Sequence, residues 1–360
     1  CETYGGTPCE EETATGPTEQ QLSFVSGWSM FSTYMIPENT NFAEVISPIV
    51  ENIIIAKNYS GAAYLPEYNF NGIGDVLVGQ GYQLKTTTAC DLTISGAYAF
   101  PEQNPINYVQ GWNMIGYLRT ESASCDLVLA AMIDNLIIAK NSTGLAYLPE
   151  WNFNGIGHMK PGEGYQIKTT ESGNLHYLSN DVSYRISSLE VIESNLSHFA
   201  KAPVTGNNMT VVIEDAAWDV LPEEGAELAA FDHAGHMIGS ASYSSPVTAL
   251  AVWGDDATTS TKDGLEVSEA VSFKVWTSDE VREFTVKEWT EGSSSYHVDA
   301  INVASSIETY NTITEMNATV KELLKVVNVL GQEVSLNDDS FKGKVLFNIY
   351  NDGTVEKVVK

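Results

Sequence analysis

The loop 254–264 concentrates the side chains with the clearest capacity to bind a metal ion. Its sequence is GDDATTSTKDG, and it contains Asp255, Asp256 and Asp263. Carboxylate oxygens are the ligands that Ca²⁺ prefers, and a flexible loop allows three of them to converge. The spacing differs from that of an EF-hand, and a solvated acidic loop explains the same residues without a metal. Calcium is therefore the one cofactor that we consider for this chain, beside the simpler alternative of a solvated loop.

A second group of candidates pairs an aromatic ring with a neighbouring amide. Tyr68 precedes Asn69, and Trp151 precedes Asn152, within the matching segments YLPEYNFNGIG and YLPEWNFNGIG. Aromatic faces stack on sugar rings and amides hydrogen-bond sugar hydroxyls, so these four residues are candidates for glycan binding. The alternative is that the rings fill the core of a small β domain, which needs bulky side chains.

Motifs for catalysis do not occur in the sequence. It contains neither Gly-x-Ser-x-Gly nor His-Glu-x-x-His, and its six His residues are scattered. Among 47 acidic residues two carboxylates could converge for glycoside hydrolysis, but no spacing singles out a pair. We therefore predict a protein without catalytic residues, which is not an enzyme.

Four cysteines, Cys1, Cys9, Cys90 and Cys125, allow two disulfides or four inert thiols. Cys1 and Cys9 lie in an acidic leader, where a small disulfide loop would supply order. A Cys90–Cys125 bond would close a loop of about 35 residues and stabilise the fold by about 2–4 kcal/mol. We expect the Cys90–Cys125 pairing, and Cys1 and Cys9 are further disulfide candidates.

The elements that carry these residues are organised by an internal duplication. Residues 53–74 and 136–157 are identical at 17 of 22 positions, at an offset of 83. The match resumes in GQGYQLKTT (79–87) and GEGYQIKTT (162–170), and it extends upstream to GWSM (27–30) and GWNM (111–114). Such repetition marks one structural unit that occurs twice.

Each copy predicts a small β-rich α+β domain. A strand and a short helical segment precede a buried strand, an aromatic hairpin and a closing strand, with Gly residues at turns that require positive φ. From about Leu196 the sequence changes to short alternating strands with Gly, Asp and Asn turns, which is typical of an Ig-like β-sandwich. We expect a mainly β chain with an acidic leader at 1–20, repeat domains at 21–96 and 97–180, a sandwich at 190–310 and a terminal domain at 311–360.

Two stretches resemble known families. Residues 206–276, with GNNMT at 206–210, WGDD at 253–256 and FKVW at 273–276, resemble a β-sandwich module of secreted Bacteroidota proteins. That resemblance implies a fold and no catalytic residues.

The C-terminal 40 residues resemble the sorting domain of type IX secretion substrates. The motifs VLGQEV at 329–334, with Gly331, and IYNDGTVEK at 349–357, with Asp352, Gly353, Glu356 and Lys357, carry this resemblance. It implies recognition by the type IX secretion machinery, export, and a location outside the cell or on the outer cell surface.

The formal charge of −29, from 18 basic and 47 acidic residues, bears on possible partners. Nucleic acid and anionic membrane surfaces would repel such a chain, and no apolar run is long enough for a transmembrane helix. We expect an extracellular structural or adhesive protein that assembles with itself, as in a filament or surface layer, or with neighbouring surface proteins. The alternatives are a non-catalytic glycan-binding surface protein and the accessory C-terminal region of a secreted enzyme.

Overall fold

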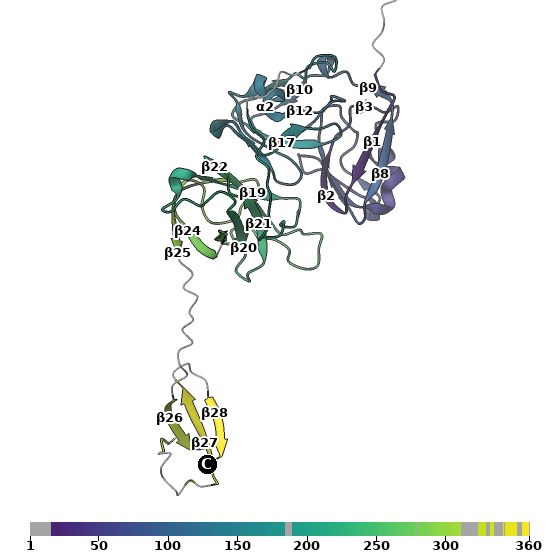
Figure 1. Ribbon diagram of the computed structural model, residues 1–360. Coiled ribbons are helices and arrows are strands. Elements are labelled where there is room, and N and C mark those ends of the chain that lie inside the picture. The colour runs from purple at the N-terminus through teal and green to yellow at the C-terminus, as the bar shows by residue number, and fades with distance from the viewer. Residues whose placement is uncertain are drawn as a thin grey trace, which may run out of the picture. The chain divides into compact units, whose positions relative to one another are not determined.

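Strands form most of the regular structure in the computed structural model of this chain (Figure 1), as the sequence predicts. The structure describes residues 16–183, 189–278, 280–310, 323–328, 332–334, 341, 343–350 and 355–359. The chain divides into two compact units, Cys1–Thr309 and Tyr310–Lys360. The first unit contains both repeats and the sandwich, and the second contains the C-terminal strands.

Repeat 1 is built around a five-stranded antiparallel sheet with the order β2-β7-β4-β5-β6. Two further pairs, β1–β8 and β3–β9, extend the domain. The elements in chain order are β1 (Glu19–Phe24), β2 (Gly27–Phe31), β3 (Met35–Ile36), α1 (Phe42–Val45), η1 (Ser47–Asn52), β4 (Ile53–Lys57), β5 (Ala63–Leu65), η2 (Pro66–Tyr68), β6 (Phe70–Asn71), β7 (Tyr82–Thr86), β8 (Cys90–Ser95) and β9 (Ala97–Tyr98).

Repeat 2 has the same sheet in the same order, β11-β17-β13-β14-β15, with the pairs β10–β18 and β12–β16. The duplicated sequence therefore folds twice into one topology. Its elements are η3 (Pro101–Gln103), β10 (Ile106–Tyr108), β11 (Gly111–Gly116), β12 (Ala123–Ser124), α2 (Cys125–Val128), η4 (Ala130–Met132), β13 (Leu136–Lys140), β14 (Ala146–Leu148), η5 (Pro149–Trp151), β15 (Phe153–Asn154), β16 (His158–Met159), β17 (Gly164–Thr169) and β18 (Gly173–Leu175).

The two repeats join through reciprocal contacts. Phe31 of repeat 1 forms a β-bridge to Glu163, and the equivalent Ile115 of repeat 2 forms one to Gln80. Equivalent turn glycines also make reciprocal contacts between the repeats. Gly79 (φ +78°) lies against Ile106 and Gly162 (φ +85°) lies against Leu22, and a Cβ at either position would come within 3 Å of the other repeat. Glycine is thus required there by φ and by the close approach of the repeats, which are related by an approximate twofold.

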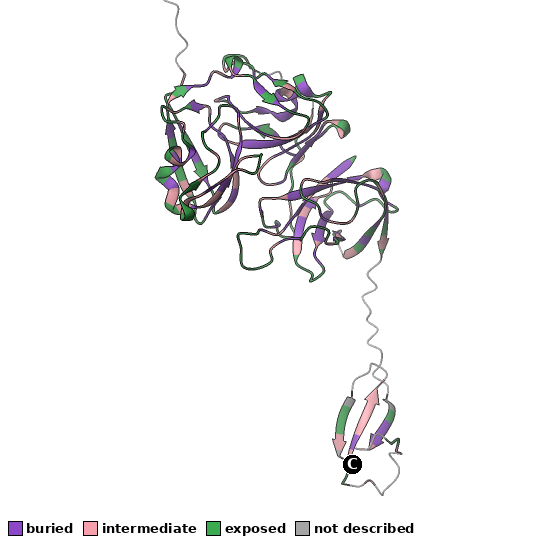
Figure 2. Cartoon of the chain, turned by 180° about the vertical axis from the view of Figure 1, so that it is seen from behind, coloured by how far each residue is buried: buried purple, intermediate pink, exposed green. Residues whose placement is uncertain are grey.

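The sandwich is a single seven-stranded sheet with the order β21-β20-β23-β24-β25-β19-β22. It curls until its edge strands nearly meet, since a Cβ on Gly239 would lie 2.5 Å from the carbonyl oxygen of Ala251. Its apolar core takes residues from all seven strands, and Figure 2 colours much of these strands as buried. The elements are β19 (Asn208–Glu214), η6 (Asp215–Ala217), β20 (Glu227–Phe231), β21 (Met237–Ser242), β22 (Val247–Trp253), β23 (Ser272–Trp276), β24 (Val281–Glu291) and β25 (Ile301–Tyr310).

The second unit holds three antiparallel strands, β26 (Leu323–Asn328), β27 (Val345–Tyr350) and β28 (Val355–Val359), packed around the buried Leu346. Glu356 and Lys357 of the expected sorting signal lie exposed on β28. Gly331, Asp352 and Gly353 lie outside the described residues, as do Cys1 and Cys9. The sorting function of this unit stays a prediction.

Candidate functional site

The outward face of each repeat sheet is identical in the two copies of the duplication. Side chains alternate along a strand, so residues opposite the core point outward. In repeat 1, Tyr64, Tyr82 and Leu84 face the core, while cross-strand pairing places their neighbours together on the other side. We name that side face 1, and it comprises Trp28, Met30, Ile55, Lys57, Ala63, Leu65, Phe70, Gln83 and Lys85.

Repeat 2 presents the same nine residue types at the equivalent positions. The strand pairing is equivalent as well. This surface is face 2, and it comprises Trp112, Met114, Ile138, Lys140, Ala146, Leu148, Phe153, Gln166 and Lys168. All nine positions are identical in the two repeats, so the two faces offer the same chemical groups to whatever packs against them.

A tryptophan flanked by two lysines forms the polar half of each face. Lys57 Nζ lies 4.5 Å from the ring centroid of Trp28, and Lys85 Nζ lies 6.0 Å from it. The Trp112 ring of repeat 2 has Lys140 at 4.5 Å and Lys168 at 5.9 Å. Cation–π attraction holds lysines at such distances, so both repeats preserve a cationic cluster within an apolar surface.

The sandwich covers the apolar half of face 2. Ile138, Ala146, Leu148 and Phe153 are buried in one cluster with four aliphatic residues from the outer side of the sandwich sheet. Those four residues are Val212, Val247, Ile301 and Val303. Strand β19 is consequently buried on both of its sides.

A buried ion pair accompanies this apolar contact. Lys140 Nζ donates to Asp299 Oδ1 at 2.9 Å and to Asn208 Oδ1 at 3.2 Å. Burial lowers the pKa of Lys140, and the carboxylate of Asp299 opposes that effect. The sandwich thus offers face 2 both aliphatic surface and a carboxylate.

The sandwich also reaches the polar half of face 1. Asp256 Oδ2 accepts hydrogen bonds from Trp28 Nε1 at 2.6 Å and from Lys85 Nζ at 2.7 Å. Burial alone would raise the pKa of Asp256, but hydrogen bonds from Lys85, Thr258 and Trp28 outweigh it and lower the pKa. Gln83 adds a hydrogen bond to the carbonyl of Gly206 at 2.8 Å.

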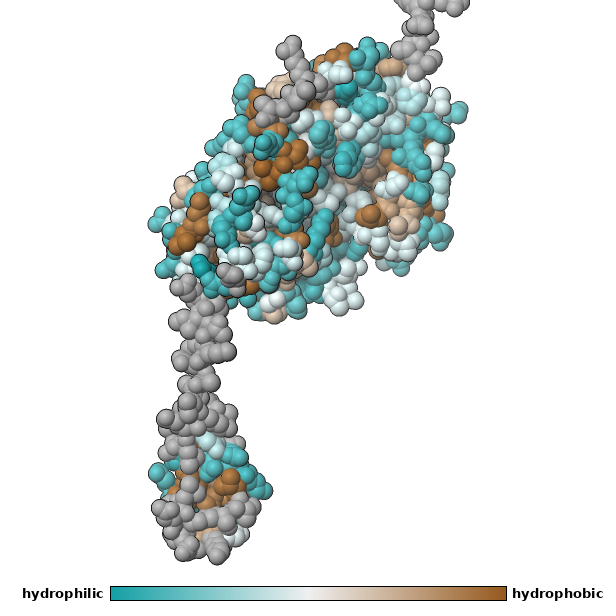
Figure 3. All heavy atoms as spheres, viewed as in Figure 1, coloured by the Kyte–Doolittle hydropathy of each residue, from teal (hydrophilic) through white to brown (hydrophobic). Residues whose placement is uncertain are grey.

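The remaining half of face 1 is not covered by the sandwich. Ile55, Ala63 and Leu65 are only half-buried, whereas their equivalents in face 2 are buried. Phe70 is 52% exposed, and Tyr68 beside it is 70% exposed. Figure 3 shows hydrophobic patches between hydrophilic residues on the face of the molecule in view. Since both faces have the same composition, the open half of face 1 can accept what the closed half of face 2 accepts.

The acidic loop 254–264 takes part in this docking through Asp256. Asp255 Oδ1 accepts from the backbone N–H of Asp263, and Asp263 Oδ1 accepts from that of Asp256. Among the residues that the structure describes, no group of three His, Cys, Asp or Glu is arranged to hold a metal ion. Asp255 and Asp263 close the loop, Asp256 pairs with Lys85, and calcium binding stays a prediction.

The glycan candidates fall into different environments. Asn69 and Asn152 end η2 and η5 in the left-handed conformation, with φ of 48° and 50°. A turn of this kind explains an asparagine without a ligand. Trp151 is half-buried against the cluster beneath the sandwich, and Tyr68 is exposed. Of the two aromatic candidates, Tyr68 has the more open surroundings.

The expected Cys90–Cys125 disulfide is wrong in this structure, where both thiols are free. Cys125 is buried in the core of repeat 2, and Cys90 packs against the core of repeat 1. Each thiol therefore fills space in its own domain. Burial raises the pKa of both, so the reactive thiolate is disfavoured.

Sequence reasoning missed the residues that dock the domains, above all Trp28, Lys85 and Lys140. The sequence signal for them was their identity across the two repeats, but that identity does not single them out, because the exposed Glu67 and Glu150 are identical as well. The partner of Lys85, Asp256, is predicted by the sequence as a calcium ligand and not as a docking residue.

Comparisons with known proteins leave the family open. No family model matches the chain, no curated protein matches it, and no solved structure matches it. In the described part of the chain, none of the helices has the length and apolar character needed to cross a membrane.

Proposed function

We propose that this chain is a non-catalytic structural or adhesive protein of the outer cell surface, exported by type IX secretion, and that copies of it associate through face 1. One observation carries the proposal, namely that the apolar half of face 1 is open while the same residues in face 2 are closed by a protein domain. Exposed apolar patches bordered by polar groups are typical of protein interaction sites.

Lys57 specifies the polar part of the partner. Its equivalent Lys140 binds Asp299, whereas Lys57 forms no ion pair with the described residues. Burial lowers the pKa of Lys57, and the more distant Asp256 opposes this. A partner that covers face 1 with a carboxylate near Lys57 would reproduce the contact in repeat 2.

A second copy of the chain offers such a surface on its sandwich. Val220 and Leu221 are adjacent, 56% and 54% exposed, and are followed by the exposed Glu223 and Glu224. Contact between face 1 of one copy and this segment of the next joins two different surfaces. Such head-to-tail contacts generate open filaments or rings.

Complementing variants test this association. Phe70→Ser and Leu221→Ser should each reduce the association constant roughly thirtyfold, since each removes about 2 kcal/mol of apolar burial. Neither variant forms long assemblies, but an equimolar mixture restores one intact contact and forms dimers. Sedimentation velocity over a concentration series measures this, with the exposed Val109→Ser as the control. A wild-type chain that stays monomeric at every concentration contradicts the proposal.

Glycan binding is the second candidate function, favoured by the exposure of Tyr68. A glycan array distinguishes the two, because Tyr68→Ala should abolish a glycan signal while Trp151→Ala should leave it. If the unmodified protein gives no signal, the glycan hypothesis fails and the association hypothesis is unaffected.

A further inference from the structure

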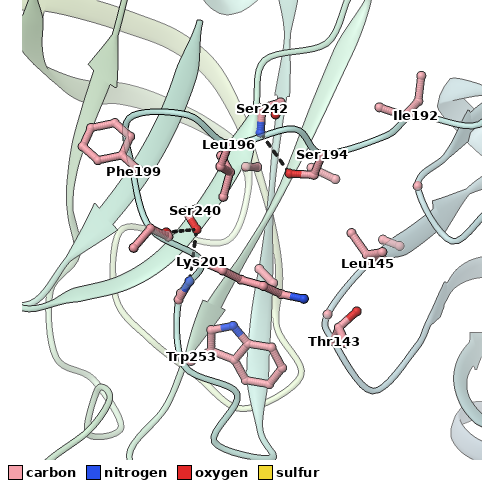
Figure 4. A pocket seen from close by; sticks show the side chains of 18 of the residues that line it. Thr143, Leu145, Ile192, Ser194, Leu196, Phe199, Lys201, Ser240, Ser242 and Trp253 are labelled. Carbon is pink, nitrogen blue, oxygen red and sulfur yellow. Dashed lines mark hydrogen bonds between the residues drawn. The ribbon is translucent and has the colours of Figure 1, made fainter. Parts of the chain in front are cut away.

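A cavity of about 560 Å³ lies between repeat 2 and the sandwich, away from face 1. Its walls are the repeat 2 turn at 143–146, the segment 192–202 that leads into the sandwich, and strands β21 and β22. Figure 4 shows side chains from all three directions converging on this space. The volume falls in the range of small-molecule sites.

The segment 192–202, which we name the strap, is held in place by Glu227 of strand β20. The buried carboxylate of Glu227 accepts hydrogen bonds from the backbone N–H groups of Ser197, His198 and Phe199. Burial alone would raise the pKa of Glu227, but these bonds outweigh it and lower the pKa, so the group stays ionised.

A second tether fixes the other end of the strap. Ser240 Oγ donates to the carbonyl of Ala200 at 2.9 Å and accepts from the backbone N–H of Ala202 at 3.2 Å (Figure 4). The cavity is therefore preformed, and a ligand would not need to order its wall.

The lining is apolar with a small cationic component. Trp253 and Phe153 are buried aromatic walls, and Lys201 contributes an ammonium group that makes no ion pair with the described residues. Ser242 Oγ is buried without a hydrogen-bond partner in the described part of the chain. Among the described lining residues there is no Asp or Glu, although acidic residues outnumber basic ones 47 to 18 in the chain.

We propose that this cavity binds a small amphipathic carboxylate. The apolar body lies against Trp253 and Phe153, the carboxylate meets the Lys201 ammonium, and the Ser242 hydroxyl finds the partner it lacks. A lining that combines apolar surface with a few convergent polar groups is the general pattern of ligand sites. Exclusion of carboxylates from the wall of a strongly acidic protein favours an anion over a cation.

Three probes with one apolar body and different head groups test the proposal on the full chain. Calorimetric titration with octanoate, octan-1-ol and octylamine should rank them in that order of affinity. The net charge of −29 attracts the amine and repels the carboxylate, so a preference for octanoate requires a local cause. Octylamine that binds as tightly as octanoate overturns the proposal.

Variants locate the binding. Lys201→Met should weaken octanoate binding about fivefold and leave octan-1-ol unchanged, as expected for a partly solvated ion pair. Lys160→Met, at an exposed lysine outside the cavity, is the matched control. Ala249→Phe fills the cavity and should abolish binding of both, and Ser194→Phe on the exposed strap tests the same point if the first variant does not fold. The proposal is contradicted if octanoate still binds the variants with a filled cavity, or if Lys201→Met leaves octanoate affinity unchanged.

Discussion

Asn69 and Asn152 show how one residue type can suggest a ligand and serve a turn. Both have positive φ at the end of a 3-10 helix. Asn152→Ala should destabilise the fold by about 1 kcal/mol, because a side chain with Cβ is strained in the left-handed region, whereas Asn152→Gly should be nearly neutral. Urea unfolding measures both. Equal losses for Ala and Gly would show that the amide itself matters.

Asp256 is the residue on which the docking of the sandwich onto face 1 depends. Asp256→Asn should destabilise the fold by about 3 kcal/mol, because Lys85 loses its buried counter-charge. Asp134→Asn, at an exposed aspartate, is the control.

The effect of Asp256→Asn should depend on pH. The pKa of Asp256 is lowered in the folded chain, so its stabilisation is complete above the unfolded value of about 3.9 and is lost as pH falls through the folded value. Unfolding curves of wild type and variant should therefore converge in acid. A difference that persists at the lowest pH would assign the effect to packing.

At the scale of elements, β4 and β13 are the same strand in two environments. Ile55 of β4 is half-buried on face 1, and Ile138 of β13 is fully buried beneath the sandwich. Ile138→Ala should cost about 3 kcal/mol through the cavity that it leaves, and Ile55→Ala less than about 1 kcal/mol. Each variant is the other's control in thermal unfolding. Equal costs would mean that the sandwich contributes nothing to the burial of Ile138.

The strands were predictable from alternation and the repeat, and the helical segments were predicted less well. In repeat 1, the short helical segment that the sequence predicts is a single α turn, α1, followed by the 3-10 helix η1. Pro48 sits at the start of η1, where a residue without an N–H cannot continue the α-helical bonding. The equivalent stretch of repeat 2 is also short, although it contains no proline.

At the scale of the whole molecule, the charge of −29 opposes association between copies. Salt at about 0.15 M screens charges beyond about 8 Å, so association through face 1 should strengthen as salt rises from a low concentration. Sedimentation at several salt concentrations measures this, and Phe70→Ser should remain monomeric throughout. Association that weakens with salt would indicate that the Lys57 ion pair outweighs the general repulsion.

The sequence alone determined the duplication, the mainly β character and the position of most strands, because these follow from local alternation and identity. It also placed Asp256 and the aromatic hairpins among the candidates. Only the tertiary structure decided that Asp256 binds Lys85 and Trp28, that the two cysteines fill separate cores, and that one of two identical faces is open. The physical reason is that burial depends on what packs against a surface, and residues distant in the sequence supply that contact.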